Sequence, residues 1–131
     1  MPTPFDIFRQ RLLAAANGVL RQRGYQLQDD PIQFDSGLFR FAGRPAGGAQ
    51  AFIDVQLLLY RGGGPSRFEV KLWRSDHPNE KVRLGIWLRE QGVVTLADDA
   101  GWWEFATAPD LEAALADAAG GLEHWCDSGR E

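Results

Sequence analysis

Few residues of this chain have types and spacing suited to chemistry, and the most suggestive group is Asp76-His77-Pro78-Asn79-Glu80. An imidazole beside a carboxylate can act as a general base, so His77 with Asp76 and Glu80 is a candidate catalytic site for a small hydrolase or nuclease. No nucleophile is identifiably directed at it. Proline and asparagine are also typical of exposed turns, and a turn explains the segment equally well.

Patterns for metal or cofactor binding are weaker. Adjacent carboxylates occur at Asp29-Asp30 and Asp98-Asp99, but both pairs have turn contexts, and a metal site needs several converging ligands. The glycines at 62–64 lack the lysine and the serine or threonine that follow in a phosphate-binding loop. We therefore expect no metal and no cofactor.

His124 and Cys126, the remaining reactive types, lie two positions apart near a helix end. Side chains at that spacing diverge, so the two cannot form an activated pair or a shared metal site there.

The five tryptophans give a stronger signal. Trp103 and Trp125 are expected in the core with Phe105. Trp73 and Trp87 fall, by strand alternation, on the polar side of a sheet, and rings with a polar rim are typical of recognition surfaces. The candidate binding residues on this side are Trp73, Trp87, Tyr60, Arg83, Lys71 and Gln56. Alternatively, arginine and lysine stems lie over these rings, or the loop Gly43–Gln50 covers them.

Composition predicts an ordinary globular domain over residues 1–131. The chain is 44% hydrophobic and 24% charged, and no apolar run approaches the roughly 20 residues that span a bilayer. The start lacks a secretory pattern and the chain has a single cysteine, so we expect a cytoplasmic protein. The net charge of −4 makes membrane or nucleic-acid binding unlikely as the main activity.

Two helices are expected to flank the strands. Thr3-Pro4 with Asp6 has the composition of a helix start, as has Thr107 with Pro109 and Asp110. The first helix is predicted to run to Gly24. Apolar residues recur at spacings of three and four in both segments, so each helix carries one apolar stripe.

A sheet is predicted between the helices. In Ala51–Arg61 one face carries the aliphatic residues Ile53, Val55, Leu57 and Leu59. Phe68, Val70 and Leu72 continue the row across a Gly-rich reversal at 62–65. Pairing Tyr60 with Arg67 satisfies every inward position of this hairpin. Further predicted strands are Leu38–Ala42, the row Val82, Leu84, Ile86 and Leu88, then Val93–Leu96 and Trp102–Phe105, with a short extended piece at Ile32–Phe34.

These elements predict an α+β two-layer sandwich. An antiparallel meander of about five strands packs its aliphatic face against an N-terminal and a C-terminal helix.

Several short motifs resemble an uncharacterised bacterial family, a domain of unknown function. They are LRQRGY, the strand pair AFIDVQLLLY and SRFEVKLW, VRLGIWL, and GWWEFATAPDLEAAL. In that family an N-terminal helix ends in Gly-aromatic, and a Trp-Trp pair precedes the last helix. The matching positions here are Gly24, Tyr25, Gln56, Phe68, Val70, Trp102, Trp103 and Glu104. The resemblance implies a fold and no reaction.

We therefore expect a non-catalytic binding or interaction module, an adaptor or an immunity-type protein, that uses the outer sheet face to bind a protein or a second copy of itself. The alternative is the His77-centred hydrolase or nuclease. A third hypothesis, stacking of nucleic acid on the tryptophans, is disfavoured by the net charge.

Overall fold

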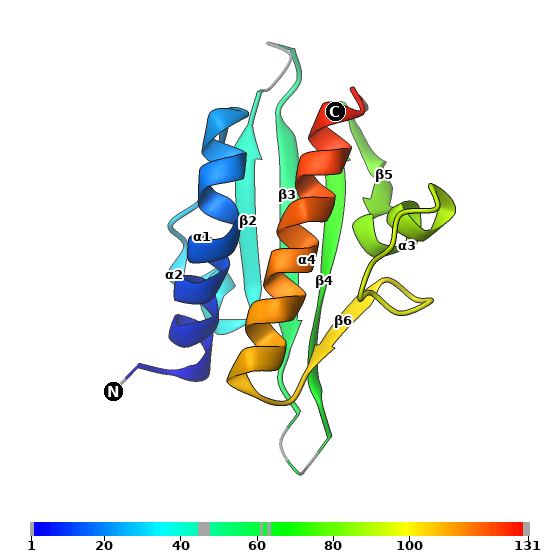
Figure 1. The fold of residues 1–131 in the computed structure, drawn as a ribbon. Helices are drawn as coiled ribbons and strands as arrows, with labels where there is room; N and C mark the ends of the chain where they lie inside the picture. The colour runs from blue at the N-terminus through cyan, green and yellow to red at the C-terminus, as the bar shows by residue number, and fades with distance from the viewer. Residues whose placement is uncertain (1, 45–47, 61, 63, 130–131) are drawn as a thin grey trace.

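The computed structural model describes residues 2–44, 48–60, 62 and 64–129, which form an antiparallel sheet with helices on one face (Figure 1). The predicted α+β two-layer architecture is thereby confirmed. The elements are α1 (Pro4–Gln22), β1 (Tyr25–Leu27), α2 (Pro31–Asp35), β2 (Leu38–Gly43), β3 (Ala51–Leu58), β4 (Ser66–Arg74), β5 (His77–Arg83), α3 (Leu84–Glu90), β6 (Trp102–Phe105) and α4 (Ala108–Asp127).

The sheet is a meander whose last edge is divided between two strands. Its order is β1-β2-β3-β4-β5, and β6 also pairs with β4. The first half of β4 pairs with β6, where Glu69 lies opposite Trp102. The second half pairs with β5, where Lys71 lies opposite Arg83. The two edge strands therefore meet beside the middle of β4.

Both long helices begin with the expected capping residues. The Thr3 hydroxyl accepts a hydrogen bond from the Asp6 backbone N–H, and the Asp6 carboxylate accepts one from the Thr3 N–H. That backbone hydrogen bond lowers the pKa of Asp6. Thr107 and Asp110 form the same reciprocal box at the start of α4. Each box fixes where its helix begins, because it satisfies N–H groups that have no partner within the helix.

The core lies between the helices and the inner face of the sheet. Phe8 of α1 contacts Phe39 and Phe68, with ring centroids 5.3 and 5.5 Å away, and Trp103 stacks on Phe68 at 5.5 Å. The apolar rows predicted on β3 and β4 are buried here: Ile53, Val55 and Leu57 with Phe68, Val70 and Leu72. Trp103 and Trp125 are in the core as expected.

The predicted register of the β3–β4 hairpin is wrong by two residues. Arg67 lies opposite Leu58 rather than Tyr60, and Val70 lies opposite Val55 rather than Leu57. A shift of two residues keeps every side chain on its face, so the alternation that fixed the faces could not detect the error. The reversal itself includes Gly63, and the loop at 43–50 includes 45–47, which are outside the described residues.

The predicted strand through Leu84, Ile86 and Leu88 is also wrong, because β5 ends at Arg83 and the chain turns into α3. The next stretch of the β4 edge is occupied by β6, which leaves no place for a longer β5. Leu84, Trp87 and Leu88 have the spacing of one helix face, and all three are buried.

Two shorter predictions fail for local reasons. Ile32–Phe34 is helical, since the Asp30 carboxylate accepts hydrogen bonds from the N–H groups of Ile32 and Gln33 and caps α2. Val93–Leu96 is a loop and not a strand. Asp117 of α4 holds this loop by accepting hydrogen bonds from Thr95 Oγ1 at 2.6 Å and from the Leu96 N–H at 2.9 Å. The short edge strand β1 has no counterpart among the predicted strands.

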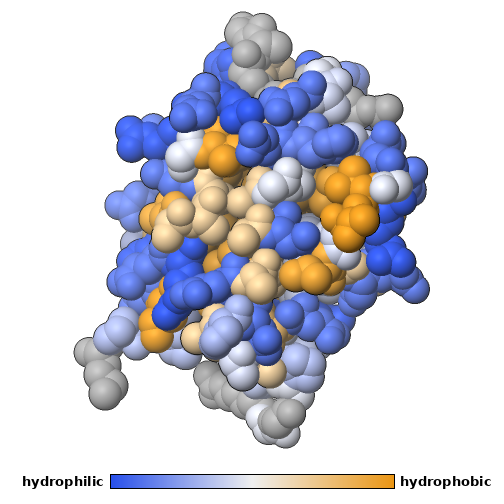
Figure 2. Space-filling view, in the orientation of Figure 1, coloured by the Kyte–Doolittle hydropathy of each residue, from blue (hydrophilic) through white to orange (hydrophobic). Residues whose placement is uncertain are grey.

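The helix-covered face is shown in Figure 2. Pale hydrophobic residues lie along α1 and α4, a stronger hydrophobic patch lies over α3 and the loop after it, and hydrophilic residues surround both. Val94 and Leu96 of that loop are exposed, as is Ile32 of α2.

The close packing of α3 yields a test of this architecture. Gly85→Ala would place a Cβ 2.8 Å from both Ala97 Cβ and Gly101 Cα. Relief requires the backbone of the 97–101 loop to move, so we expect the free energy of unfolding in urea to fall by about 1–3 kcal/mol.

Gly120→Ala on α4 is the matched control, because the new Cβ would have no neighbouring atom within 4 Å. That variant should gain about 0.5–1 kcal/mol from helix propensity alone. Equal effects of the two substitutions would contradict the position of α3.

Candidate functional site

The outer face, by which we mean the sheet face opposite α1 and α4, is covered by no helix of the described ranges (Figure 1). Strand alternation places the polar and aromatic residues of β2, β3, β4 and β6 there. These side chains form two groups, one around Asp54 and the other around Glu69 and Arg67.

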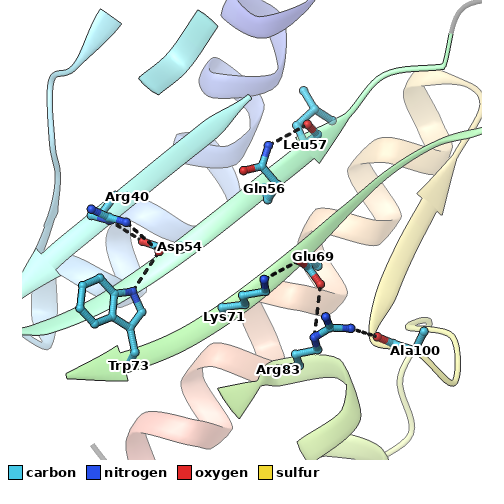
Figure 3. Close-up of polar contacts among 9 residues, drawn as sticks. All are labelled: Arg40, Asp54, Gln56, Leu57, Glu69, Lys71, Trp73, Arg83 and Ala100. Carbon is cyan, nitrogen blue, oxygen red and sulfur yellow. Dashed lines mark hydrogen bonds and ion pairs between the residues drawn. The ribbon is translucent and has the colours of Figure 1, made fainter. Parts of the chain in front are cut away.

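Asp54 is the centre of the first group, and only 8% of the residue is exposed. Its carboxylate accepts hydrogen bonds from Arg40 Nε at 2.7 Å, Arg40 Nη2 at 3.0 Å and Trp73 Nε1 at 2.9 Å (Figure 3). The hydrogen bond with Asp54 raises the pKa of Arg40. A buried carboxylate with three donors is fully used within the protein.

The ring of Trp73 has several neighbours within the chain. It stacks on Phe52 with centroids 4.2 Å apart, and the guanidinium of Arg40 lies 5.2 Å from its centroid. Lys81 Nζ approaches the same ring to 5.3 Å. The alternative in which basic stems lie over the rings is thus the arrangement found at Trp73, and this ring is committed to contacts within the chain.

Glu69 lies where β5 and β6 meet beside β4, and only 4% of the residue is exposed. Its Oε1 is 3.2 Å from Lys71 Nζ, and its Oε2 is 3.8 Å from Arg83 Nε (Figure 3). Among the described atoms, Oε2 has no hydrogen-bond partner. One buried carboxylate therefore fixes two cations on the outer face.

Arg67 lies at the neighbouring position of the same face, between two aromatic rings. Its Cζ is 4.3 Å from the centroid of Trp102 and 5.6 Å from that of Tyr60. Tyr60 is 49% exposed, and Leu58, directly opposite Arg67 on β3, is 37% exposed. This part of the outer face presents large apolar side chains to solvent.

Sequence reasoning left Arg67, Leu58 and Trp102 out of the candidate binding residues. Alternation from the buried Trp103 would have placed Trp102 on the outer face. Of the predicted residues, Trp73, Tyr60, Arg83 and Lys71 lie in the two groups on this face. Gln56 lies between them, and its Nε2 donates to the carbonyl oxygen of Leu57 (Figure 3) and to that of Ser36.

The prediction that Trp87 shares the outer face with Trp73 is wrong. Trp87 is on α3, 6% exposed, and its ring meets that of Trp125 edge-on with centroids 5.0 Å apart. The chain becomes helical after Arg83, so strand alternation no longer applies at residue 87.

His77 lies at the start of β5 and its side chain is 58% exposed. Its Nε2 is 3.8 Å from Asp76 Oδ2 and its Nδ1 is 4.0 Å from Glu80 Oε2, beyond hydrogen-bonding distance in both cases. Asp76 is 2.7 Å from Arg74 Nη2 instead.

A pocket of about 200 Å³ opens beside His77 at the end of the sandwich. Its lining residues are Tyr25, Ala51, Phe52, Leu72, Trp73, Arg74, His77, Glu80, Val82 and Trp125. The lining includes no serine, threonine or cysteine to act as a nucleophile with His77.

Within the described part of the chain, no group of three or more histidine, cysteine, aspartate or glutamate side chains is placed to hold a metal ion. In the same residues, no helix combines the length and apolar character needed to cross a bilayer.

Comparison with models of known protein families, with curated proteins and with solved structures finds no match to this chain. The resemblance to a bacterial family of unknown function therefore stays a prediction.

The Asp54 group predicts a large cost for removing its carboxylate. Asp54→Ala leaves the Arg40 guanidinium and the Trp73 N–H without their acceptor, so the free energy of unfolding should fall by about 3 kcal/mol. Asp76→Ala, which breaks the exposed pair with Arg74, is the control and should cost less than about 0.5 kcal/mol. Urea denaturation of both variants measures the difference, and similar values would show that the Asp54 group is not structural.

Proposed function

We propose that this protein is a non-catalytic binding module, of the adaptor or immunity type, which contacts a protein through its outer sheet face. The observation that supports the proposal best is the exposure of Leu58 and Tyr60 beside the half-buried Trp102. Large apolar side chains within a charged rim can bury much area at low cost in side-chain entropy. The partner is a protein or a second copy, and nucleic acid is not expected.

The geometry shifts the proposed contact relative to the sequence-based expectation. The ring of Trp73 already contacts Phe52, Arg40 and Lys81 within the chain. Trp87 belongs to the core. The proposed contact therefore centres on Leu58, Tyr60 and Trp102. A cytoplasmic location and a bacterial origin stay predictions.

The alternative, a hydrolase or nuclease using His77, receives less support. Asp76 and Glu80 are both too far from the imidazole for a hydrogen bond, and Asp76 is paired with Arg74. A base needs an orienting partner and a substrate group within reach.

The proposed function is tested by removing the exposed apolar groups. The double variant Leu58→Ser/Tyr60→Ser should lose a partner that the unchanged protein captures from its cells of origin and binds again after purification. We expect at least a tenfold weakening, equal to about 1.4 kcal/mol, in calorimetric titration with the purified partner.

Ile32→Ser is the matched control, because Ile32 is an exposed aliphatic residue on α2 and is not among the residues of the proposed contact. It should leave binding unchanged, and circular dichroism should report the same fold for all variants. Loss of binding in the control alone, or in neither variant, would contradict the proposed face.

A further inference from the structure

We infer that the outer face receives an acidic segment of a partner protein, and that Arg67 is the residue that pairs with its carboxylates. This inference rests on the proposed function and adds the chemistry of the partner. Three observations support this inference: the face carries an excess of basic residues, aromatic rings surround Arg67, and a second copy or a nucleic acid would fit the face less well.

The outer face is basic although the chain as a whole is acidic, with a net charge of −4. Asp54 offsets the charge of Arg40, and Glu69 offsets part of the charge of Lys71 and Arg83. Basic side chains outnumber acidic ones here: Arg40, Arg67, Lys71, Lys81 and Arg83 against Asp54, Glu69 and Glu104. A face of this sign attracts an acidic partner and accelerates its association.

Arg67 and Lys81 differ from the other cations of the face, because neither has a carboxylate partner in the described part of the chain. Glu104 lies opposite Arg67 on β6, yet the two form no ion pair, and Arg67 Nε makes no hydrogen bond. Arg40 is taken up by Asp54, while Lys71 and Arg83 share Glu69. Of the two cations without a carboxylate, Lys81 lies against the Trp73 ring and Arg67 against the rings of Trp102 and Tyr60, beside the exposed Leu58.

The rings of Trp102 and Tyr60 hold the Arg67 guanidinium in place before any partner binds. A guanidinium presents a planar fork of donors that matches a carboxylate in bidentate geometry. Arg67 Nε is buried, so the fork that a carboxylate would meet is the one formed by Nη1 and Nη2. Fixing that fork in advance lowers the entropy cost of binding. Leu58 and Tyr60 would contact apolar residues of the same segment.

Two other occupants fit less well. A second copy docked face to face would bring Arg67 and its basic neighbours against their own copies, which is repulsive. A single-stranded nucleic acid needs a continuous positive groove beside its stacking rings, but Glu104 interrupts this surface and the chain's net charge opposes binding.

The probe for this inference is a fluorescein-labelled peptide of ten glutamates, titrated at low salt and followed by fluorescence polarisation. The unchanged protein should bind it saturably, and the affinity should fall as salt is added. Arg67→Gln should weaken binding about tenfold, since one charge-assisted bidentate contact is lost.

Arg21→Gln is the matched control, because it removes the same charge from an exposed position on α1. It should leave decaglutamate binding within about twofold of the unchanged protein. Thermal unfolding followed by circular dichroism checks that both variants are folded.

Three results of the binding titrations would overturn the inference. They are no binding of decaglutamate, an equal loss in both arginine variants, and tighter Arg67-dependent binding of a ten-nucleotide oligothymidylate. A dimer in sedimentation that Arg67→Glu dissociates would assign the face to a second copy instead. If Leu58→Ser/Tyr60→Ser loses a purified partner while decaglutamate fails to bind, the proposed function stands and only the acidic segment is excluded.

Discussion

Packing of α1 and α4 against the inner face of β3 and β4 is the interaction on which the rest of the structure depends. Phe8 of α1 reaches Phe39 and Phe68 at once, and α4 lies beside α1 on the same face of the sheet and contacts β6. A sheet can bury only one face in this way in a two-layer fold. The other face is then left to polar and aromatic side chains, which must satisfy one another or remain open to a partner.

The outer face does both, in different places. Around Asp54 the donors and acceptors are matched, and Trp73 is enclosed by a ring and two cations. Around Arg67 the rings and the guanidinium contact one another, but the guanidinium has no carboxylate partner among the described residues. The first group stabilises the sheet, whereas the second is the part of the surface that we propose as the contact with a partner.

The sequence was sufficient for the fold class and for the buried faces, because alternation over Ile53–Leu72 and the capping residues Thr3 and Thr107 act locally. It was insufficient for register and for α3. A two-residue slip leaves alternation intact, and the residues from Val82 to Leu88 satisfy a strand period and a helix period together. The choice between those periods depended on β6 occupying the β4 edge, a contact that joins residues far apart in the chain.

The same ambiguity explains why the candidate site was only partly predictable. Lys71, Trp73 and Arg83 were placed on the correct face because they lie within strands. Trp87 was assigned to the wrong side because residues 84–90 are helical, and strand alternation does not apply to them. Arg67 could be placed by alternation, but its lack of a carboxylate partner depends on where the Glu69 and Glu104 side chains point, which no pattern in one sequence records.

The pairing of one edge of β4 with both β5 and β6 also indicates where the chain can tolerate insertions or deletions. The chain leaves that edge at Arg83 and returns to it at Trp102, and the strand positions opposite these residues, Lys71 and Glu69, are two apart on β4. Residues 84–101 therefore form an insertion whose two ends lie close together. The buried face of α3 and the hydrogen bonds to Asp117 hold it against the rest of the fold. Its tip near Val94 is exposed, so the segment can lengthen or shorten there without disturbing the sheet. Insertions during evolution are therefore expected at this loop.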